Sequence, residues 1–210
     1  MVYIEGEGGG AARSTSRKKR DGEFRQSWKA FLEPLAEHAR EKGIVFFRCI
    51  PGRGGSTCLD TFANPLPAHQ GALRVLLVDS EKPVANVKKP WEALPGSKPA
   101  WATDDHCYLM VQCLETWLLA DIEGLRRHYD SVRQCFDVSA LRSWPKLEET
   151  NRTTLQEALE KATERCRPAY GHADGNLIIA KLDREKLKNL DSVRRLFTDL
   201  EQVITAYAES

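Results

Sequence analysis

The stretch "LRVLLVD" at residues 73–79 constrains the fold more than any other part of the chain. It is almost continuously apolar, so it has no polar face to turn towards water. A short run of this kind is typical of a strand buried on both faces, which is the environment of a central strand in a parallel sheet. The chain is therefore expected to place helices on both faces of such a sheet.

The hydrophobic periodicity elsewhere alternates between helix and strand. We predict strands at 2–4 and 44–50, a turn at 51–56, and helices at 21–42, through Cys58 to Asn64, 106–121, 153–166 and 191–207; residues 176–183 fit either type. Residues 12–21 are expected to form a mobile surface connection. The order predicts an α/β fold with a mainly parallel sheet flanked by helices and a helical C-terminal part. We expect one domain, with the core in residues 1–121 and the helical portion in 122–210.

A long connection, residues 80–104, contains four prolines and two tryptophans, Trp91 and Trp101. We expect the tryptophans to hold it against the body of the protein. Connections of this length are uncommon and are often functional, so a lid is one interpretation.

The formal net charge of +1 gives no overall field that would attract nucleic acid, so affinity for a polyanion would need local clusters. No apolar run reaches the roughly 18 residues of a membrane helix, and the N-terminus does not resemble a signal peptide. We therefore expect a cytoplasmic protein. The six cysteines form no C-x-x-C pair and are expected to be structural thiols rather than a disulfide framework.

Acidic residues follow two of the predicted strands. Glu5 and Glu7 come after the first strand; Asp79 ends the 73–79 strand and Glu81 follows two residues later. If the chain stays extended there, Asp79 and Glu81 point to the same side. Ligands of open α/β sheets bind beyond the carboxyl ends of the strands, where converging carboxylates would repel each other unless a divalent cation lies between them. Mg²⁺ or Mn²⁺ suits such oxygen ligands. The alternative is that these acids only form turns and cap helices.

A further carboxylate, Glu115, lies within "HCYLMVQCLETWLLAD", a segment that is apolar almost all round. Such a helix should be buried, and a buried carboxylate is costly unless it is paired or binds a metal. Glu115 is therefore either in a salt bridge to an Arg or Lys, or a further metal ligand or general base.

Three segments, "YIEGEGG", "VLLVDSEKP" and "LMVQCLETWLLAD", together resemble a bacterial Toprim-like family of unknown function, related to the nuclease domains of the OLD and RloB-like phage-defence proteins. "GRGGSTCLDTF" (52–62) and, more weakly, "YGHADGNLI" (170–178) extend the resemblance over most of the chain.

The resemblance implies a Toprim-like fold and a Mg²⁺-dependent nuclease acting on DNA or RNA. Glu5, Asp79, Glu81 and Glu115 would be the metal ligands, with Glu5 also serving as general acid or base. It further implies an ABC-type or SMC-like ATPase partner in phage defence.

The chain departs from the family pattern in two places. The acidic pair is D-S-E instead of D-x-D, and relatives carry a lysine beside the glycine where this chain has Tyr170-Gly171-His172. Arg53 or Lys181 could contact the scissile phosphate instead, and His172 is a further catalytic candidate. The basic run "RKKR" (17–20) could touch phosphate or be a solvated face. A non-catalytic subunit that binds an ATPase partner or nucleic acid is the alternative function.

Overall fold

The structure is a computed structural model that describes residues 1–6, 14–45, 47–52, 54–64, 66–69, 71–131, 134–141 and 144–209; of residues 14–18, 68, 172 and 173 only the backbone is described. The strands are β1 (Val2–Glu5), β2 (Cys49–Gly52), β3 (Val75–Asp79) and β4 (Cys107–Met110). The α-helices are α1 (Ser14–Phe31), α2 (Glu33–Glu41), α3 (Gly55–Ala63), α4 (Leu114–Ala120), α5 (Ile122–Tyr129), α6 (Arg152–Thr163), α7 (His172–Ile178), α8 (Arg184–Leu187) and α9 (Asp191–Ala208). Short 3-10 turns are η1 (Pro67–His69), η2 (Pro90–Glu92), η3 (Asp104–His106), η4 (Val138–Ala140), η5 (Leu147–Glu149) and η6 (Ile179–Lys181).

The four strands of the described residues form one all-parallel sheet in the order β2-β1-β3-β4. Val75–Asp79 is an interior strand of this sheet, and Leu76 and Leu77 are fully buried. The α/β fold and the central position of the 73–79 run are therefore confirmed. Because the chain passes from β1 outward to β2 and then returns to β3 on the other side, the topological switch point lies between β1 and β3.

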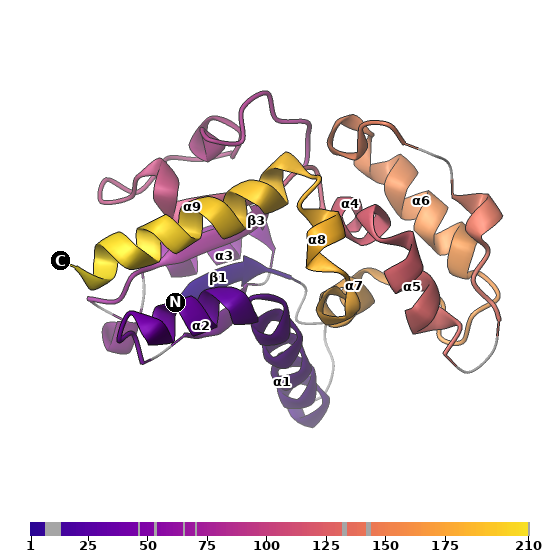
Figure 1. Cartoon of the computed structure of the whole chain (residues 1–210), viewed down its shortest axis with the longest axis horizontal. Helices are drawn as coiled ribbons and strands as arrows, with labels where there is room; N and C mark the ends of the chain where they lie inside the picture. Colours follow the sequence, from indigo (N-terminus) through magenta and orange to yellow (C-terminus); the bar gives the residue numbers. More distant parts are fainter. Residues whose placement is uncertain are drawn as a thin grey trace.

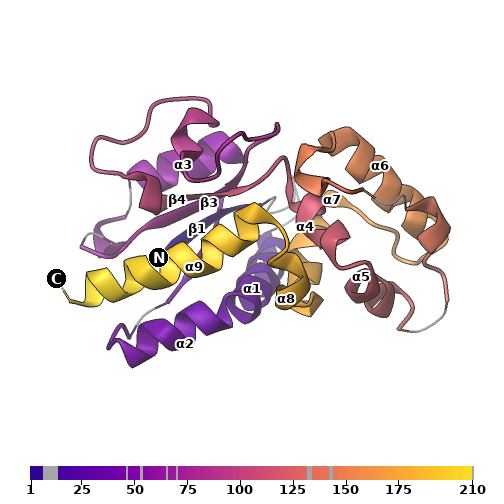
Figure 2. The same cartoon turned by 45° about the horizontal axis from the view of Figure 1, so that its top comes forward.

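Side chains alternate between the two faces of the sheet, as strand geometry requires. Residues of one face, including Ile4 and Leu77, pack with α1, α2 and α9, whereas those of the other face, including Tyr3 and Leu76, pack with α3 and the 80–104 connection. Figure 2 shows α3 on one side of the sheet and α2 and α9 on the other. Covered faces on both sides account for the nearly continuous apolar sequence of β3.

A group of helices, α4 to α8, lies beside the sheet in the view of Figure 1, and α9 then returns across the sheet. Trp117 of α4 is fully buried in contact with the rings of Trp28 and Phe31 of α1. The C-terminal half of the chain is therefore mostly helical, and one core cluster joins it to the sheet.

The long connection is held as expected. The Trp91 ring packs near Phe62 of α3, with ring centroids 6.1 Å apart, and its indole N–H donates to the Thr103 carbonyl within the connection at 2.8 Å. Trp101 packs against Phe62 with ring centroids 4.9 Å apart, and the Arg74 guanidinium lies 3.7 Å from the Trp101 ring centroid.

The prediction of one helix over 21–42 is wrong in two respects. The helix begins at Ser14, so part of the expected surface connection is helical, and it ends at Phe31 before a second helix begins at Glu33. Pro34 explains the break, because it has no N–H to donate to the preceding turn and is tolerated only in the first turn of a helix.

One strand boundary and one predicted helix were also wrong. The expected strand at 44–50 lies at Cys49–Gly52, and Val45 of the apolar run is 76% exposed. β2 is an edge strand, where Pro51 costs no sheet hydrogen bond. The expected helix at 106–121 is instead a strand, β4, followed by α4. Gln112 lies between them with φ 62°, a left-handed conformation that a continuous helix does not allow. The ambiguous 176–183 segment is helical up to Lys181, in α7 and η6.

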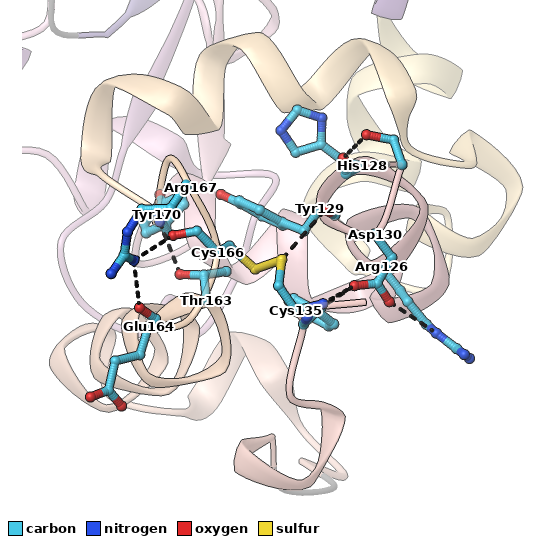
Figure 3. The surroundings of a disulfide bond; sticks show 12 residues. Arg126, His128, Tyr129, Asp130, Cys135, Thr163, Glu164, Cys166, Arg167 and Tyr170 are labelled. Carbon is cyan, nitrogen blue, oxygen red and sulfur yellow. Dashed lines mark hydrogen bonds and ion pairs between the residues drawn. A yellow bond between two sulfur atoms is a disulfide. The ribbon is translucent and has the colours of Figure 1, made fainter. Parts of the chain in front are cut away.

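The expectation of free structural cysteines is wrong for one pair. Cys135 and Cys166 form a disulfide with Cα atoms 5.0 Å apart, whereas Cys49, Cys58, Cys107 and Cys113 are free and buried. Figure 3 shows this bond joining the segment after α5 to the segment after α6. Spacing could not reveal it, because the two cysteines are 31 positions apart and meet only when the helices pack.

Gly52 should resist substitution because α3 crosses β2 closely at this position. A Cβ on Gly52 would lie 2.4 Å from Cys58 Cβ and 2.9 Å from its Cα. We expect Gly52→Ala to lower the free energy of unfolding by about 1–3 kcal/mol, the usual cost of overpacking. Gly22→Ala in α1, where a Cβ would meet no atom within 4 Å, should raise it by about 0.5–1 kcal/mol. Urea denaturation of both variants tests this, and equal effects would contradict it.

The disulfide should stabilise the protein by restricting its unfolded chain. For a loop with a sequence separation of 31 we expect a Cys135→Ser, Cys166→Ser double variant to lose about 2–4 kcal/mol of unfolding free energy under oxidising conditions. With a dithiol reductant present, the wild-type protein should fall to the stability of the variant. A difference that persists in reductant would mean that serine packing, and not the cross-link, causes the loss.

Candidate metal and phosphate site

Glu5 is the last residue of β1 and lies at the switch point between β1 and β3. Its Oε2 accepts the backbone N–H of Asp79, the last residue of β3, at 3.0 Å. The start of α3 also lies close to this carboxylate, since a Cβ on Gly55 would be 3.3 Å from Oε2, and the Gly55 N–H opposes the rise in the pKa of Glu5. Burial raises the pKa of Glu5, the Asp79 N–H opposes the rise, and the nearby Glu81 carboxylate adds to it. The sheet therefore fixes one carboxylate where ligands of such folds bind.

Asp79 carries the least compensated carboxylate of the site. Its Oδ1 is shielded from solvent and has no hydrogen-bond partner among the described residues. Burial raises the pKa of Asp79 well above its usual value, and the carboxylates of Glu5 and Glu115 raise it further. A buried oxygen of this kind either keeps a proton or needs a cation beside it.

Glu115 stands in the first turn of α4 and is 4% exposed. Tyr170 OH donates to its Oε1 at 2.8 Å, so a hydroxyl contributes to its compensation. The backbone N–H of Tyr170 donates to Oγ1 of Thr163, the last residue of α6, at 2.9 Å, and this bond helps to position Tyr170. The weakest segment of the family resemblance, residues 170–178, therefore contributes a residue that positions Glu115.

A pocket of about 220 Å³ adjoins these carboxylates. It is lined by Glu5, Gly6, Gly54, Asp79, Leu114, Glu115, Arg152, Gln156 and Asn176. Arg152 and Gln156 lie one turn apart on α6, and Asn176 of α7 accepts the Trp28 indole N–H at 2.8 Å. Sequence reasoning singled out none of these three residues. Arg152 and Gln156 lie far along the chain from the acidic motifs and belong to no motif, whereas Asn176 lies within the weakly resembling 170–178 stretch.

Glu81 follows β3 but does not continue it. Its φ of 58° lies in the left-handed region, so the reasoning that an extended chain would point Asp79 and Glu81 the same way does not hold. Its side chain is 69% exposed and lies 3.6 Å from the Arg152 guanidinium. Glu81 thus lies at the solvent side of the carboxylate group, and Arg152, which acts on the charges of Glu5 and Asp79, is its ion-pair partner.

The remaining candidates are not gathered at this pocket. Lys181 lies in η6, where its Nζ is 2.9 Å from His128 Nδ1 on α5, and it does not line the pocket. Arg53 and Glu7 lie outside the described residues. His172 begins α7, and only its backbone is described. In the basic run, Lys19 is 79% exposed and lies 3.9 Å from Glu23, which agrees with a solvated face.

The donor set at the switch point fits a hard divalent cation only in part. Within the described part of the chain, no three His, Cys, Asp or Glu side chains converge closely enough to hold a metal by themselves. Mg²⁺ does not require this, because it commonly takes one or two carboxylates and completes its shell with water and phosphate oxygens. The unpartnered Asp79 Oδ1, beside Glu5, supplies a ligand of the right chemistry.

Fold and site together define a parallel α/β protein with two partly buried carboxylates at the switch point of its sheet and an arginine facing them. The chain belongs to the DUF4276 family, a domain of unknown function, whose match covers residues 16–201. This span contains Asp79, Glu81, Glu115 and Arg152, whereas Glu5 and the rest of β1 precede it.

No curated protein and no solved structure matches the chain. None of the helices in the described ranges is long and apolar enough to cross a membrane.

The raised pKa of Asp79 predicts a pH-dependent cost. Its ordinary pKa is about 3.9, so between about pH 4 and the raised value the folded state binds more protons than the unfolded state. Stability is therefore lost as the pH rises through this window. We expect Asp79→Asn to match the wild type near pH 4 and to be more stable than the wild type at about pH 8, because the variant has no carboxylate to ionise in the buried site.

Urea denaturation at both pH values in metal-free buffer measures this difference. Glu201→Gln, which removes an exposed carboxylate of α9, is the matched control and should follow the wild type at both. An Asp79→Asn variant that is less stable than the wild type at about pH 8 would show that the ionised carboxylate is compensated in the fold.

Proposed function

We propose that this protein is a Mg²⁺-dependent phosphodiesterase, a nuclease of Toprim type acting on DNA or RNA. The observation that carries the proposal is the unpartnered, buried Asp79 Oδ1 beside Glu5 at the switch point of a parallel sheet. The fold places it where α/β proteins bind ligands, and the chemistry calls for a cation. The resemblance of the strand ends and of the 109–121 segment to Toprim-like nucleases supports the same activity.

Asp79 and Glu5 would hold the metal, with Glu115 and Glu81 close enough to act on its charge or on the waters around it. A bound Mg²⁺ would supply Lewis-acid stabilisation of the charge that develops on phosphate oxygens. Glu5 is oriented by the backbone N–H of Asp79, and its raised pKa brings it closer to neutral pH, as a general base requires.

Arg152 would take the place of the lysine that the resembling family carries. The Arg152 side chain is 38% exposed and lines the same pocket as Glu5 and Asp79. A planar guanidinium can bind two phosphate oxygens at once, so it suits a phosphodiester. The ion pair with Glu81, at 3.6 Å and on the solvent side, is weak enough for a phosphate to replace it.

The direct test is cleavage of single- and double-stranded DNA and RNA by the full chain with Mg²⁺ or Mn²⁺, with EDTA as the blank. We expect Glu5→Gln and Asp79→Asn to lower kcat/KM by about 10²–10⁴-fold, the range of a lost acid–base group. Arg152→Gln should raise KM more than it lowers kcat, and Arg152→Lys should recover part of the loss. Asp105→Asn, which removes an exposed carboxylate from η3, just before the start of β4, is the matched control.

Cleavage that survives both Glu5→Gln and Asp79→Asn would overturn the assignment. If no substrate is cut, titration with Mn²⁺ decides: binding by the wild type but not by Asp79→Asn keeps the metal site, and no binding points to the non-catalytic subunit. The ATPase partner and the role in phage defence, implied by the resemblance, stay predictions.

A further inference from the structure

A second pocket also adjoins the two central carboxylates. It has a volume of about 560 Å³ and is lined by Glu5, Gly55, Ser56, Leu59, Asp60, Leu76, Val78, Asp79, Glu81, Leu94, Pro95 and Gly96. Glu5 and Asp79 also line the 220 Å³ pocket that contains Arg152. They therefore form a wall that the two pockets share.

The walls of this second pocket are apolar. Leu76 and Val78 of β3 are 0% and 2% exposed and form its floor, Leu59 comes from α3, and Leu94 and Pro95 come from the long connection. The connection touches α3 at the mouth, since a Cβ on Gly96 would lie 3.7 Å from Leu59 Cδ2. A volume of this size with apolar walls and few polar groups is typical of a small-molecule site.

The polar groups of the second pocket are nearly all acceptors. Its described lining contains four carboxylates and no Lys, Arg or His side chain, whereas the neighbouring pocket contains Arg152, Gln156 and Asn176. The carboxylates of the second pocket would repel a phosphate, whereas the pocket that contains Arg152 would attract one. A flat neutral ring that carries N–H donors satisfies both the apolar walls and the carboxylates.

We propose that the second pocket binds the nucleobase next to the phosphate under attack, and that Asp60 selects bases that present N–H donors. The identity of the ligand rests on the proposed function, because a base would enter here when its phosphate lies beside Arg152 across the Glu5–Asp79 wall. Asp60, exposed on α3, stands at the rim of the pocket. Guanine fits best, since its N1–H and 2-amino group present two parallel donors to one carboxylate. Uracil and thymine present one N–H between two carbonyls that the carboxylate repels.

Binding of nucleosides in metal-free buffer tests the pocket without requiring cleavage. The probes are guanosine, inosine (which lacks the 2-amino group) and uridine, followed by ligand-observed NMR with the full chain. We expect guanosine to bind about tenfold more tightly than uridine, within the discrimination that a bidentate base contact gives, with inosine between them. Asp60→Asn keeps the shape of an exposed side chain and should remove the difference.

Two further variants fix the location. Ser56→Trp places a bulky side chain at an exposed position of the lining and should weaken all three nucleosides together. Glu201→Gln on α9 is the control and should bind as the wild type does.

The outcomes separate this inference from the proposed function. Equal binding of guanosine and uridine, no binding of either, or a preference that survives Asp60→Asn overturns the base pocket, whether or not the protein cuts nucleic acid. Spermidine that binds through Asp60 while guanosine does not would make this a polycation site and overturns it as well. A guanosine preference lost in Asp60→Asn supports the pocket, even where cleavage fails and the nuclease proposal falls.

Discussion

The hydrogen bond from the Asp79 N–H to the Glu5 carboxylate is the contact on which the site depends. It crosses from the end of β3 to the end of β1, so the parallel pairing of these strands fixes it before any ligand is present. The strand pairing that stabilises the sheet also brings the Glu5 carboxylate to the backbone N–H of Asp79. The Asp79 side chain, left without a partner at Oδ1 among the described residues, carries the resulting cost, which shows as its raised pKa. A bound cation would remove this cost, so folding and ligand binding act on the same two residues.

Glycine allows the arrangement to be this close. Gly52 lets α3 approach the edge of the sheet, and Gly55 lets the first turn of α3 reach the Glu5 carboxylate. Gly6 is a third such position, because a Cβ there would lie 2.5 Å from a ring carbon of Phe24 and 3.0 Å from the Asn176 amide. The glycines around β1 therefore do more than form a loose turn. Two of them, Gly52 and Gly6, remove side chains at contacts between the sheet and the helices that line the pockets.

The sequence predicts the parts of this structure that a local pattern determines. The apolar 73–79 run defines a central strand, and the acids at its end and after residues 2–4 meet at one edge because parallel strands end together. Where a pattern has two solutions, it failed: residues 107–110 are as apolar as a buried helix but form β4, and Pro51 reads as a turn but lies on an edge strand. Arg152 escaped detection for another reason, as did the contact of Tyr170 with Glu115. Packing of α6 and α7 brings them to the site over long sequence separations, and no local signal encodes that packing.

The ends of β3 and β4 show how the strain at the site is sustained. Glu81 and Gln112 both have positive φ, which costs a residue with a side chain of order 1 kcal/mol or more, and the Glu81 N–H donates to the Gln112 carbonyl at 2.9 Å. Ser80, between Asp79 and Glu81, is buried and accepts the Gln112 N–H at 2.8 Å, while the Gln112 amide donates to the carbonyls of Glu148 and Thr150. These last bonds reach the segment that leads into α6 and Arg152. The middle serine of the D-S-E sequence is thus part of a polar network. Ser80 holds the strained turn that ties the acidic end of β3 to the segment before α6, the helix that carries Arg152.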